Sequence, residues 1–272
     1  MSRIAKVFKK ARRIALIPYI TAGYPTIEAT TKIVELLANA GSDIIEIGIP
    51  FSDPLADGVT IQKASFKALQ NGTTPELCLD MAKQISRNIP IPLIFMTYFN
   101  SVLNYGLEKF CRDCALSGID GLIVPDLPPE EGSKLEKAAK DQGIDLIYLL
   151  PPTCTDERIE LVVQRSRGFI YLVSVTGVTG ARDRLPDNLE NFVTRIRKVA
   201  KLPLCVGFGI SSAEQARLVA RIADGVIIGS KIIQLIELED EFRSLTTFIA
   251  ELRNSLDEVG RRKETSAVDK LD

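Results

Sequence analysis

Three carboxylates gather in one segment, EIGIPFSDPLADGVTIQ (46–62), which begins as an apolar run and continues into turn residues. Isoleucines flank Glu46, and a carboxylate in such surroundings loses hydration, so its pKa should rise toward the range useful for proton transfer. A salt-bridged glutamate at the rim of the fold is an equally good interpretation. Asp53 and Asp57 follow among prolines and a glycine, and they fit either a helix cap or a hydrogen-bonding, acid–base pair.

Glycine-rich turns form the second candidate site. Three late segments carry glycine at or just after the end of an apolar run: SVTGVTGAR (174–182), VGFGIS (206–211) and IIGSKI (227–232). Backbone N–H groups at such turns bind anions, with help from the dipole of a following helix. Each glycine alone fits an ordinary tight turn, but the three together favour a phosphate site. Its predicted donors are Gly180, Gly209, Gly229 and Ser230.

The chain contains no histidine. This excludes Ser-His-Asp and Cys-His nucleophiles and disfavours zinc and metal-dependent aldolase sites, so we predict no metal. A Schiff-base aldolase needs a lysine near the carboxyl end of a strand. Lys201 instead precedes an apolar run, and Lys231 follows one within the predicted anion-binding turn. Carbon–carbon or proton-transfer chemistry carried by carboxylates is the class that remains.

Apolar runs alternate with amphipathic segments along the chain, and these elements must position the candidate residues. The runs are continuously apolar, as in parallel strands covered on both faces. They span 14–20, 43–49, 91–98, 119–125, 144–150, 169–175, 202–208 and 223–229, with amphipathic segments such as 26–41, 130–143 and 212–223 between them. Eight such units predict an α/β fold, a single (β/α)8 TIM barrel, whose active face is formed by the loops after the strands.

Composition limits the remaining possibilities. The net charge of −1 provides no basic field for nucleic acid, and no apolar run approaches the ~18 residues of a membrane span. Five cysteines without framework spacing indicate a reducing cytoplasm. We expect residues 1–13 to form a short extra helix over the barrel floor. Residues 1–258 are expected to form the catalytic domain, and 259–272 a polar, frayed tail.

Apolar side chains near the predicted strand ends indicate a flat hydrophobic ligand between them. These residues are Tyr19, Met96, Ile123, Leu149 and Tyr171. For each residue taken singly, ordinary barrel core is an equally good interpretation.

The motifs together resemble the tryptophan synthase alpha chain family over about residues 3 to 258. The resemblance rests on PFSDPLADG within 46–62, on PYITAGYP (18–25) and LIVPDLPPEE (122–131), and on SVTGVTGAR and GFGIS. It implies retro-aldol cleavage of indole-3-glycerol phosphate to indole and D-glyceraldehyde 3-phosphate. By motif position it implies that Glu46 is the general acid and base, that Asp57 accepts a hydrogen bond from the indole nitrogen, and that Tyr171 is a site tyrosine.

The resemblance also assigns the binding residues. The family's phosphate site maps to the same four positions as the glycine-turn prediction. Its indole pocket maps to Tyr19, Met96, Ile123, Pro125, Leu149 and Thr179. The loops 52–60 and 176–188 are expected lids, closed by a hydrogen bond between Thr179 and Asp57.

A partner is implied as well. Family members pass indole through a tunnel to a beta chain that uses pyridoxal phosphate (PLP) to make L-tryptophan, in an alpha2beta2 heterotetramer. The alpha chain itself is expected to hold no cofactor. Asp53, Asn100 and Pro128 match positions that face this partner.

Two other functions fit parts of the pattern. A catalytically silent alpha chain would only activate its beta partner, although retention of both Glu46 and Asp57 argues against this. Another phosphate-binding barrel lyase or isomerase would share the glycine turns but would make the PFSDPLADG segment a coincidence. A purely structural barrel is the interpretation that the clustered glycines favour least.

Overall fold

The structure is a computed structural model that describes residues 1–9, 13–173, 188–207, 209–239 and 241–268, with side chains of the last segment described to 261. Its strands form one parallel sheet in the order β5-β4-β3-β2-β1-β9-β8-β7-β6. They are β1 (Ala15–Thr21), β2 (Ile45–Gly48), β3 (Leu93–Met96), β4 (Gly121–Ile123), β5 (Asp145–Ile147), β6 (Leu149–Leu150), β7 (Ile170–Val173), β8 (Leu204–Gly207) and β9 (Gly225–Ile228). Each of the eight predicted apolar runs overlaps one strand, or in one case two.

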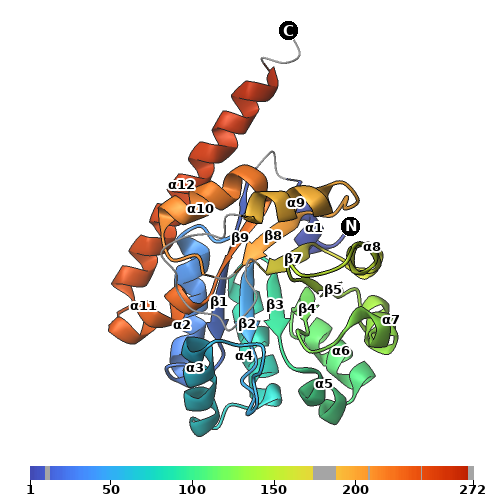
Figure 1. The fold of residues 1–272 in the computed structure, drawn as a ribbon. Coiled ribbons are helices and arrows are strands. Elements are labelled where there is room, and N and C mark those ends of the chain that lie inside the picture. The colour runs from blue at the N-terminus through green and yellow to red at the C-terminus, as the bar shows by residue number, and fades with distance from the viewer. Residues whose placement is uncertain (10–12, 174–187, 208, 240, 269–272) are drawn as a thin grey trace.

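The fifth run is divided at Tyr148, which separates β5 from β6. β5 pairs with β4 on one side, and β6 pairs with β7 on the other. The backbone N–H of Tyr171 donates to the carbonyl of Tyr148 (3.1 Å), and that of Arg167 donates to Leu146 (2.9 Å). The two short strands are therefore one bent barrel strand, and the eight-stranded barrel closes through it, as predicted (Figure 1).

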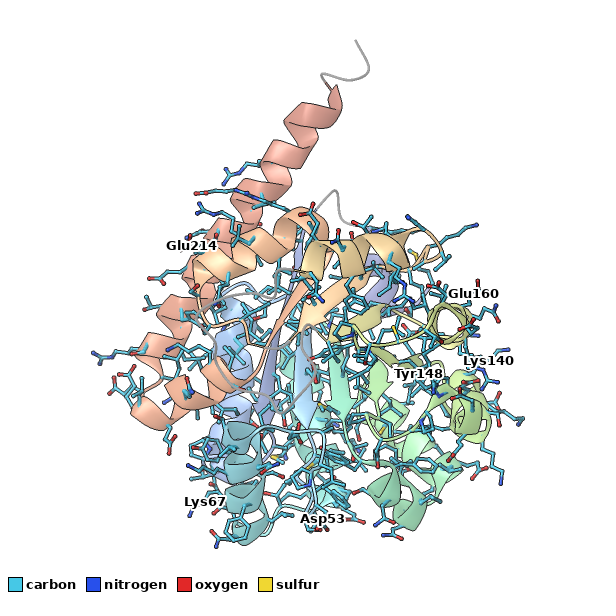
Figure 2. All side chains as sticks on the ribbon, viewed as in Figure 1. Asp53, Lys67, Lys140, Tyr148, Glu160 and Glu214 are labelled. Carbon is cyan, nitrogen blue, oxygen red and sulfur yellow. The ribbon has the colours of Figure 1, made fainter. Side chains whose placement is uncertain are left out.

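Helices surround the barrel (Figure 1). They are α1 (Arg3–Val7), α2 (Ile27–Asn39), α3 (Val59–Gln70), α4 (Pro75–Asn88), α5 (Phe99–Tyr105), α6 (Leu107–Leu116), α7 (Ser133–Asp141), α8 (Asp156–Arg165), α9 (Leu189–Arg197), α10 (Ala213–Ile222), α11 (Ser230–Leu238) and α12 (Arg243–Val268), with the 3-10 turn η1 (Pro129–Glu131) before α7. Their outward faces carry exposed charges such as Lys67, Lys140, Glu160 and Glu214 (Figure 2). Threonine or serine caps begin α2, α4, α8 and α10.

The strands bury side chains on both faces, which explains their continuous apolar character. Ile45 and Ile47 belong to the core between strands and helices, whereas Ile44 belongs to the cluster inside the barrel. The alternation along a strand therefore points Glu46, between Ile45 and Ile47, into the barrel.

Helix α1 covers the floor of the barrel, as the sequence predicted. Ile4 is fully buried in the interior cluster. Arg3 forms an ion pair with Asp120 at 2.9 Å, and the Ser2 hydroxyl donates to Asp145. These contacts anchor the short helix at the amino ends of the strands, opposite the expected active face.

Helix α12 is tied to the barrel by a buried ion pair. Nη1 of Arg253 donates to Asp43 Oδ2 (2.8 Å) and to the carbonyl of Ile14 (3.1 Å). The helix then continues to Val268 and projects from the barrel (Figure 1). The expected boundary at residue 258 therefore lies within α12, and Val259 is still buried. A separate, frayed tail from 259 stays a prediction.

Within the part of the chain that the structure describes, no helix combines the length and the apolar character that crossing a membrane requires.

Replacement of Ile4 by alanine should lower the free energy of unfolding by about 2–5 kcal/mol, because it opens a cavity in the barrel floor. Urea unfolding would measure the loss. Leu116→Ala is the matched control, since Leu116 is 71% exposed on α6; its effect should stay within about 0.5 kcal/mol. Equal losses in the two variants would show that α1 does not seal the interior.

Candidate active site

Glu46 is the buried acid of the barrel interior. It lies on β2 in register with Tyr19 of β1 and Ile94 of β3, and only 1% of its surface is exposed. Among the described residues, its Oε2 atom has no hydrogen-bond partner. Burial, and secondly the charge of Asp57, raise the pKa of Glu46 to about 8. The side chain therefore carries a proton at neutral pH and can give it up.

Asp57 comes from the loop after β2 and reaches the same cavity. Its backbone N–H donates to the carbonyl of Pro54 (3.0 Å), and Gln62 Nε2 donates to the carbonyl of Asp57 (2.8 Å). Burial raises its pKa to about 6, while a hydrogen bond from the Tyr98 hydroxyl (3.0 Å) acts in the opposite direction. Asp57 is thus ionised at a pH at which Glu46 is still protonated.

Two tyrosines complete the walls around these acids. Tyr19 and Tyr171 both line the cavity, and burial raises the pKa of each phenol. Each ring needs a glycine on the neighbouring strand: a Cβ at Gly48 would lie 2.1 Å from the Tyr19 hydroxyl, and one at Gly207 would lie 2.4 Å from that of Tyr171. These glycines are therefore required by close packing.

Glycine turns and the start of a helix also line the cavity. Gly209 has a φ of 77°, a left-handed conformation that favours glycine. Ser230 begins α11, and Gly229 occupies its N-cap without a side-chain hydrogen bond. The N-terminal backbone N–H groups of this helix can bind an anion. Gly180, the fourth predicted donor, lies outside the described residues.

One cavity joins these groups. It is lined by Tyr19, Glu46, Asp57, Ile61, Met96, Tyr171, Gly209, Ile210, Ile227, Gly229 and Ser230. The structure therefore places the three predicted catalytic residues beside three of the four predicted phosphate donors. Tyr19 and Met96 of the predicted indole pocket also line it.

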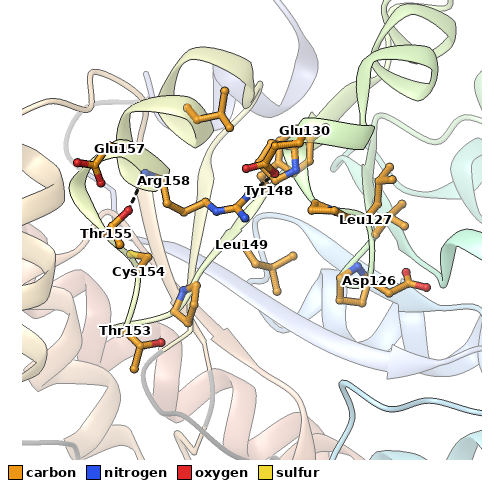
Figure 3. A pocket seen from close by; sticks show the side chains of 16 residues that line it. Asp126, Leu127, Glu130, Tyr148, Leu149, Thr153, Cys154, Thr155, Glu157 and Arg158 are labelled. Atoms are coloured by element: carbon orange, nitrogen blue, oxygen red, sulfur yellow. Dashed lines mark hydrogen bonds and ion pairs between the residues drawn. The ribbon is translucent and has the colours of Figure 1, made fainter.

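The other predicted indole-pocket residues that the structure describes do not line this cavity. Ile123 is fully buried in the interior cluster against which Met96 packs. Pro125 and Leu149 line a neighbouring groove between the loops after β4 and β6 (Figure 3). Leu149 also packs against the interior cluster, so its side chain lies between the groove and the barrel interior. Thr179 lies outside the described residues, and its hydrogen bond to Asp57 stays a prediction.

The residues predicted to face a partner lie on the same side of the barrel. Asp53 and Asn100 are exposed, and Pro128 is half-buried at the groove. Figure 2 shows Asp53 beyond the carboxyl ends of the strands. Across the groove, Arg158 forms an ion pair with Glu130 at 2.5 Å.

The sequence analysis missed four residues that contact the site. Ile61, Ile210 and Ile227 line the cavity, and Tyr98 hydrogen-bonds to Asp57. Tyr98 is the last residue of the apolar run 91–98. The rule that active-site residues follow strand ends could have found it. The apolar residues carry no such signal, because their positions are equally those of core.

The fold and the site together define a class. A closed (β/α)8 barrel holds a protonated carboxyl and an ionised one in a single cavity, at the carboxyl ends of its strands. This arrangement is typical of an enzyme that moves protons on a bound small molecule, with carboxyl groups in place of histidine.

Comparison with known proteins narrows the class. Residues 5–259 match the model of the family described as Tryptophan synthase alpha chain. The chain is 57% identical over 257 residues to the tryptophan synthase alpha chain of Dehalococcoides mccartyi, covering 94% of this chain and 100% of that one. It is 44% identical over 262 residues to that of Geobacter sulfurreducens, covering 94% and 99%.

Solved structures agree. A chain of Mycobacterium tuberculosis tryptophan synthase matches with a TM-score of 0.88 at 38% identity, covering 94% of this chain and 98% of that chain. Tryptophan synthase subunit alpha from Legionella pneumophila matches with a TM-score of 0.89 at 35% identity, covering 95% and 99%. This chain belongs to the tryptophan synthase alpha chain family.

Burial of Glu46 should be visible in the pH dependence of stability. Its pKa rises from 4.5 to about 8 on folding, so between these pH values the folded protein holds a proton that the unfolded chain releases. Stability therefore falls as pH rises through this window. Glu46→Gln removes the effect and should be more stable than the wild type by more than about 1 kcal/mol at pH 8.

Urea unfolding at pH 5 and pH 8 measures this difference, which should shrink at pH 5. Glu160→Gln is the control, because Glu160 is exposed on α8. A Glu46→Gln variant whose advantage over the wild type is the same at both pH values would contradict the assignment.

Proposed function

We propose that this chain cleaves indole-3-glycerol phosphate into indole and D-glyceraldehyde 3-phosphate, the alpha reaction of tryptophan synthase. Family membership supports the carbon–carbon lyase activity and a place in tryptophan biosynthesis. The observation that carries the residue assignment is the single cavity in which Glu46 and Asp57 lie together with the glycine turns at Gly209 and Gly229.

The first step is proton transfer to the indole ring. Glu46 is protonated at neutral pH because its carboxyl is buried. It gives this proton to indole C3, and positive charge develops on the ring nitrogen. Asp57 is ionised and accepts a hydrogen bond from the nitrogen's N–H, which stabilises that charge.

The second step breaks the carbon–carbon bond. Glu46 is now a carboxylate and takes the proton of the hydroxyl on the carbon attached to C3. That oxygen becomes the aldehyde oxygen, the C–C bond electrons return to the ring, and indole leaves. Glu46 ends the cycle protonated, as it began, because the hydroxyl proton replaces the one it gave to C3, so one side chain serves as both acid and base.

The remaining walls bind the two ends of the substrate. Tyr19, Met96 and Tyr171 provide apolar surface for the indole ring. The amides at Gly209, Gly229 and Ser230 bind the phosphate, with help from the positive end of the α11 dipole. Gly180 is the fourth donor. Ile123, Pro125, Leu149 and Thr179 complete the proposed indole pocket.

The partner in this proposal is a tryptophan synthase beta chain, in an alpha2beta2 heterotetramer. The alpha chain holds no cofactor, and PLP belongs to the beta chain, which receives indole. Asp53, Asn100 and Pro128 contact the partner. Leu55, in the loop after β2, is 88% exposed. A large apolar side chain exposed beside Asp53 supports the proposal that this loop contacts a partner.

We place the enzyme in the cytoplasm. All five cysteines are free thiols, and four of them are buried, as expected of a chain that folds in a reducing compartment.

Glu46→Gln should reduce indole release by at least about 100-fold, because the proton donor and acceptor is lost. Ligand binding should stay nearly intact, since the amide keeps the shape of the carboxyl. Indole released from indole-3-glycerol phosphate, with the beta chain present, is the measurement, and calorimetric ligand binding is the control. Turnover like that of the wild type would reject the role of Glu46. No indole release by the purified wild-type chain, alone or with its partner, would favour the silent activator.

The pH profile of kcat/KM should be bell-shaped. Activity requires ionised Asp57 and protonated Glu46, whose pKa values are about 6 and about 8. Activity should therefore fall below about pH 6, as Asp57 takes up a proton, and above about pH 8, as Glu46 loses one. Initial rates of indole release from pH 5 to 9 test this. Activity that keeps rising beyond pH 8 is incompatible with Glu46 as the initial acid.

A further inference from the structure

We propose that Tyr98 is a positioning residue for the cleavage reaction. It connects the loop after β2 to the end of β3 and orients the Asp57 carboxylate toward the substrate. The kinetic effect that we expect rests on the proposed function. The contacts of Tyr98, and the titration of Asp57 without ligand that tests them, do not depend on it.

The hydroxyl of Tyr98 forms two hydrogen bonds, and both are to consecutive residues of the loop after β2. It donates to Asp57 Oδ2 at 3.0 Å and accepts from the backbone N–H of Ala56 at 3.0 Å. A backbone N–H can only donate, so the hydroxyl must act as acceptor toward Ala56. Its single proton is therefore directed at Asp57. The carboxylate rotamer and the hydroxyl rotamer fix each other.

The ring of Tyr98 holds the other end of the same loop. It stacks on Phe51, with ring centroids 5.1 Å apart and an interplanar angle of 19°. Between these two contacts the loop is largely in solvent, with Ser52, Asp53 and Leu55 exposed. One side chain thus contacts the loop at its start and at its catalytic end.

The base of this connection is rigid. Tyr98 is 5% exposed and occupies the N-cap of α5, directly after β3. Its neighbour Thr97 donates its backbone N–H to Ile123 (3.0 Å), and the N–H of Phe99 is bonded to Asp126 Oδ1 (2.9 Å). The tyrosine is therefore anchored to β4 and its loop, so Asp57 is positioned from the barrel wall rather than by its own loop alone.

This arrangement has a chemical consequence. A carboxylate accepts at both oxygens, so with Oδ2 of Asp57 bonded to Tyr98, Oδ1 can still accept the N–H of an indole ring. A hydroxyl donor also stabilises the ionised carboxylate, which is the form that can accept that bond. Tyr98 never touches the reacting atoms; it acts through Asp57.

The test is Tyr98→Phe, which removes both hydrogen bonds and keeps the ring on Phe51. The matched control is Tyr105→Phe, because the Tyr105 hydroxyl also donates to an aspartate, Asp113 Oδ2 at 2.8 Å, outside the cavity. Carbon-13 shifts of labelled aspartate carboxyls, followed over pH in the free protein, report the pKa of Asp57. This pKa should rise above its value of about 6 in Tyr98→Phe and stay constant in Tyr105→Phe.

Kinetics give a second readout. Tyr98→Phe should lower kcat/KM for indole release about tenfold, equivalent to ~1.4 kcal/mol, and move the acidic limb of its pH profile upward. In an Asp57→Asn background, the same change should cause little further loss, because the residue through which it acts is gone. Tyr105→Phe should leave rate and profile unchanged.

An unchanged Asp57 titration in Tyr98→Phe would overturn the proposal, as would an equal loss of activity in the Asp57→Asn background. A loss of activity without movement of the acidic limb would also overturn it, since this is the signature of general destabilisation. If the wild type releases no indole, the proposed function fails, while the titration of Asp57 still decides whether Tyr98 holds it.

Discussion

The site depends on one unfavourable interaction: a carboxyl group held in the apolar interior of a barrel. Glu46 is 1% exposed, and one of its oxygens has no hydrogen-bond partner among the described residues. A charge in this place is strongly disfavoured, so the group keeps its proton. The nearby charge of Asp57 acts in the same direction as burial. The fold therefore stores an acid at neutral pH without histidine, at the cost of stability as pH rises.

The barrel can contain this acid because its interior is shaped around it. Tyr19 and Tyr171 fill the space on either side, and each is accommodated by the absence of a Cβ on the next strand, at Gly48 and Gly207. The large and small side chains of neighbouring strands thus complement each other, as close packing requires. Burial in this closely packed interior raises the pKa of Glu46, so the packing of the core helps to set the pKa of the acid.

The sequence predicts those features that depend on local pattern. Continuous apolar runs predicted every barrel strand, and an acid among isoleucines predicted a raised pKa at Glu46. The sequence did not reveal the break of the fifth strand at Tyr148, because an apolar run carries no mark of where its hydrogen bonds change partner. Nor did it reveal Tyr98, whose bond to Asp57 joins positions 41 residues apart. Contacts of this kind follow from the closure of the barrel and not from spacing along the chain.

The two acids have different roles because they lie on different structural elements. Glu46 stands on a strand, where the backbone cannot move to bring it a donor, and it stays protonated. Asp57 lies on a loop, where its carboxylate accepts a hydrogen bond from the hydroxyl of Tyr98, and its pKa is lower than that of Glu46. Because their environments differ, the two carboxyl groups have different pKa values, and one is an acid while the other is an anion at the same pH. Because only the anion lies on the loop, movement of that loop would change the stabilisation of developing charge and leave the proton donor in place.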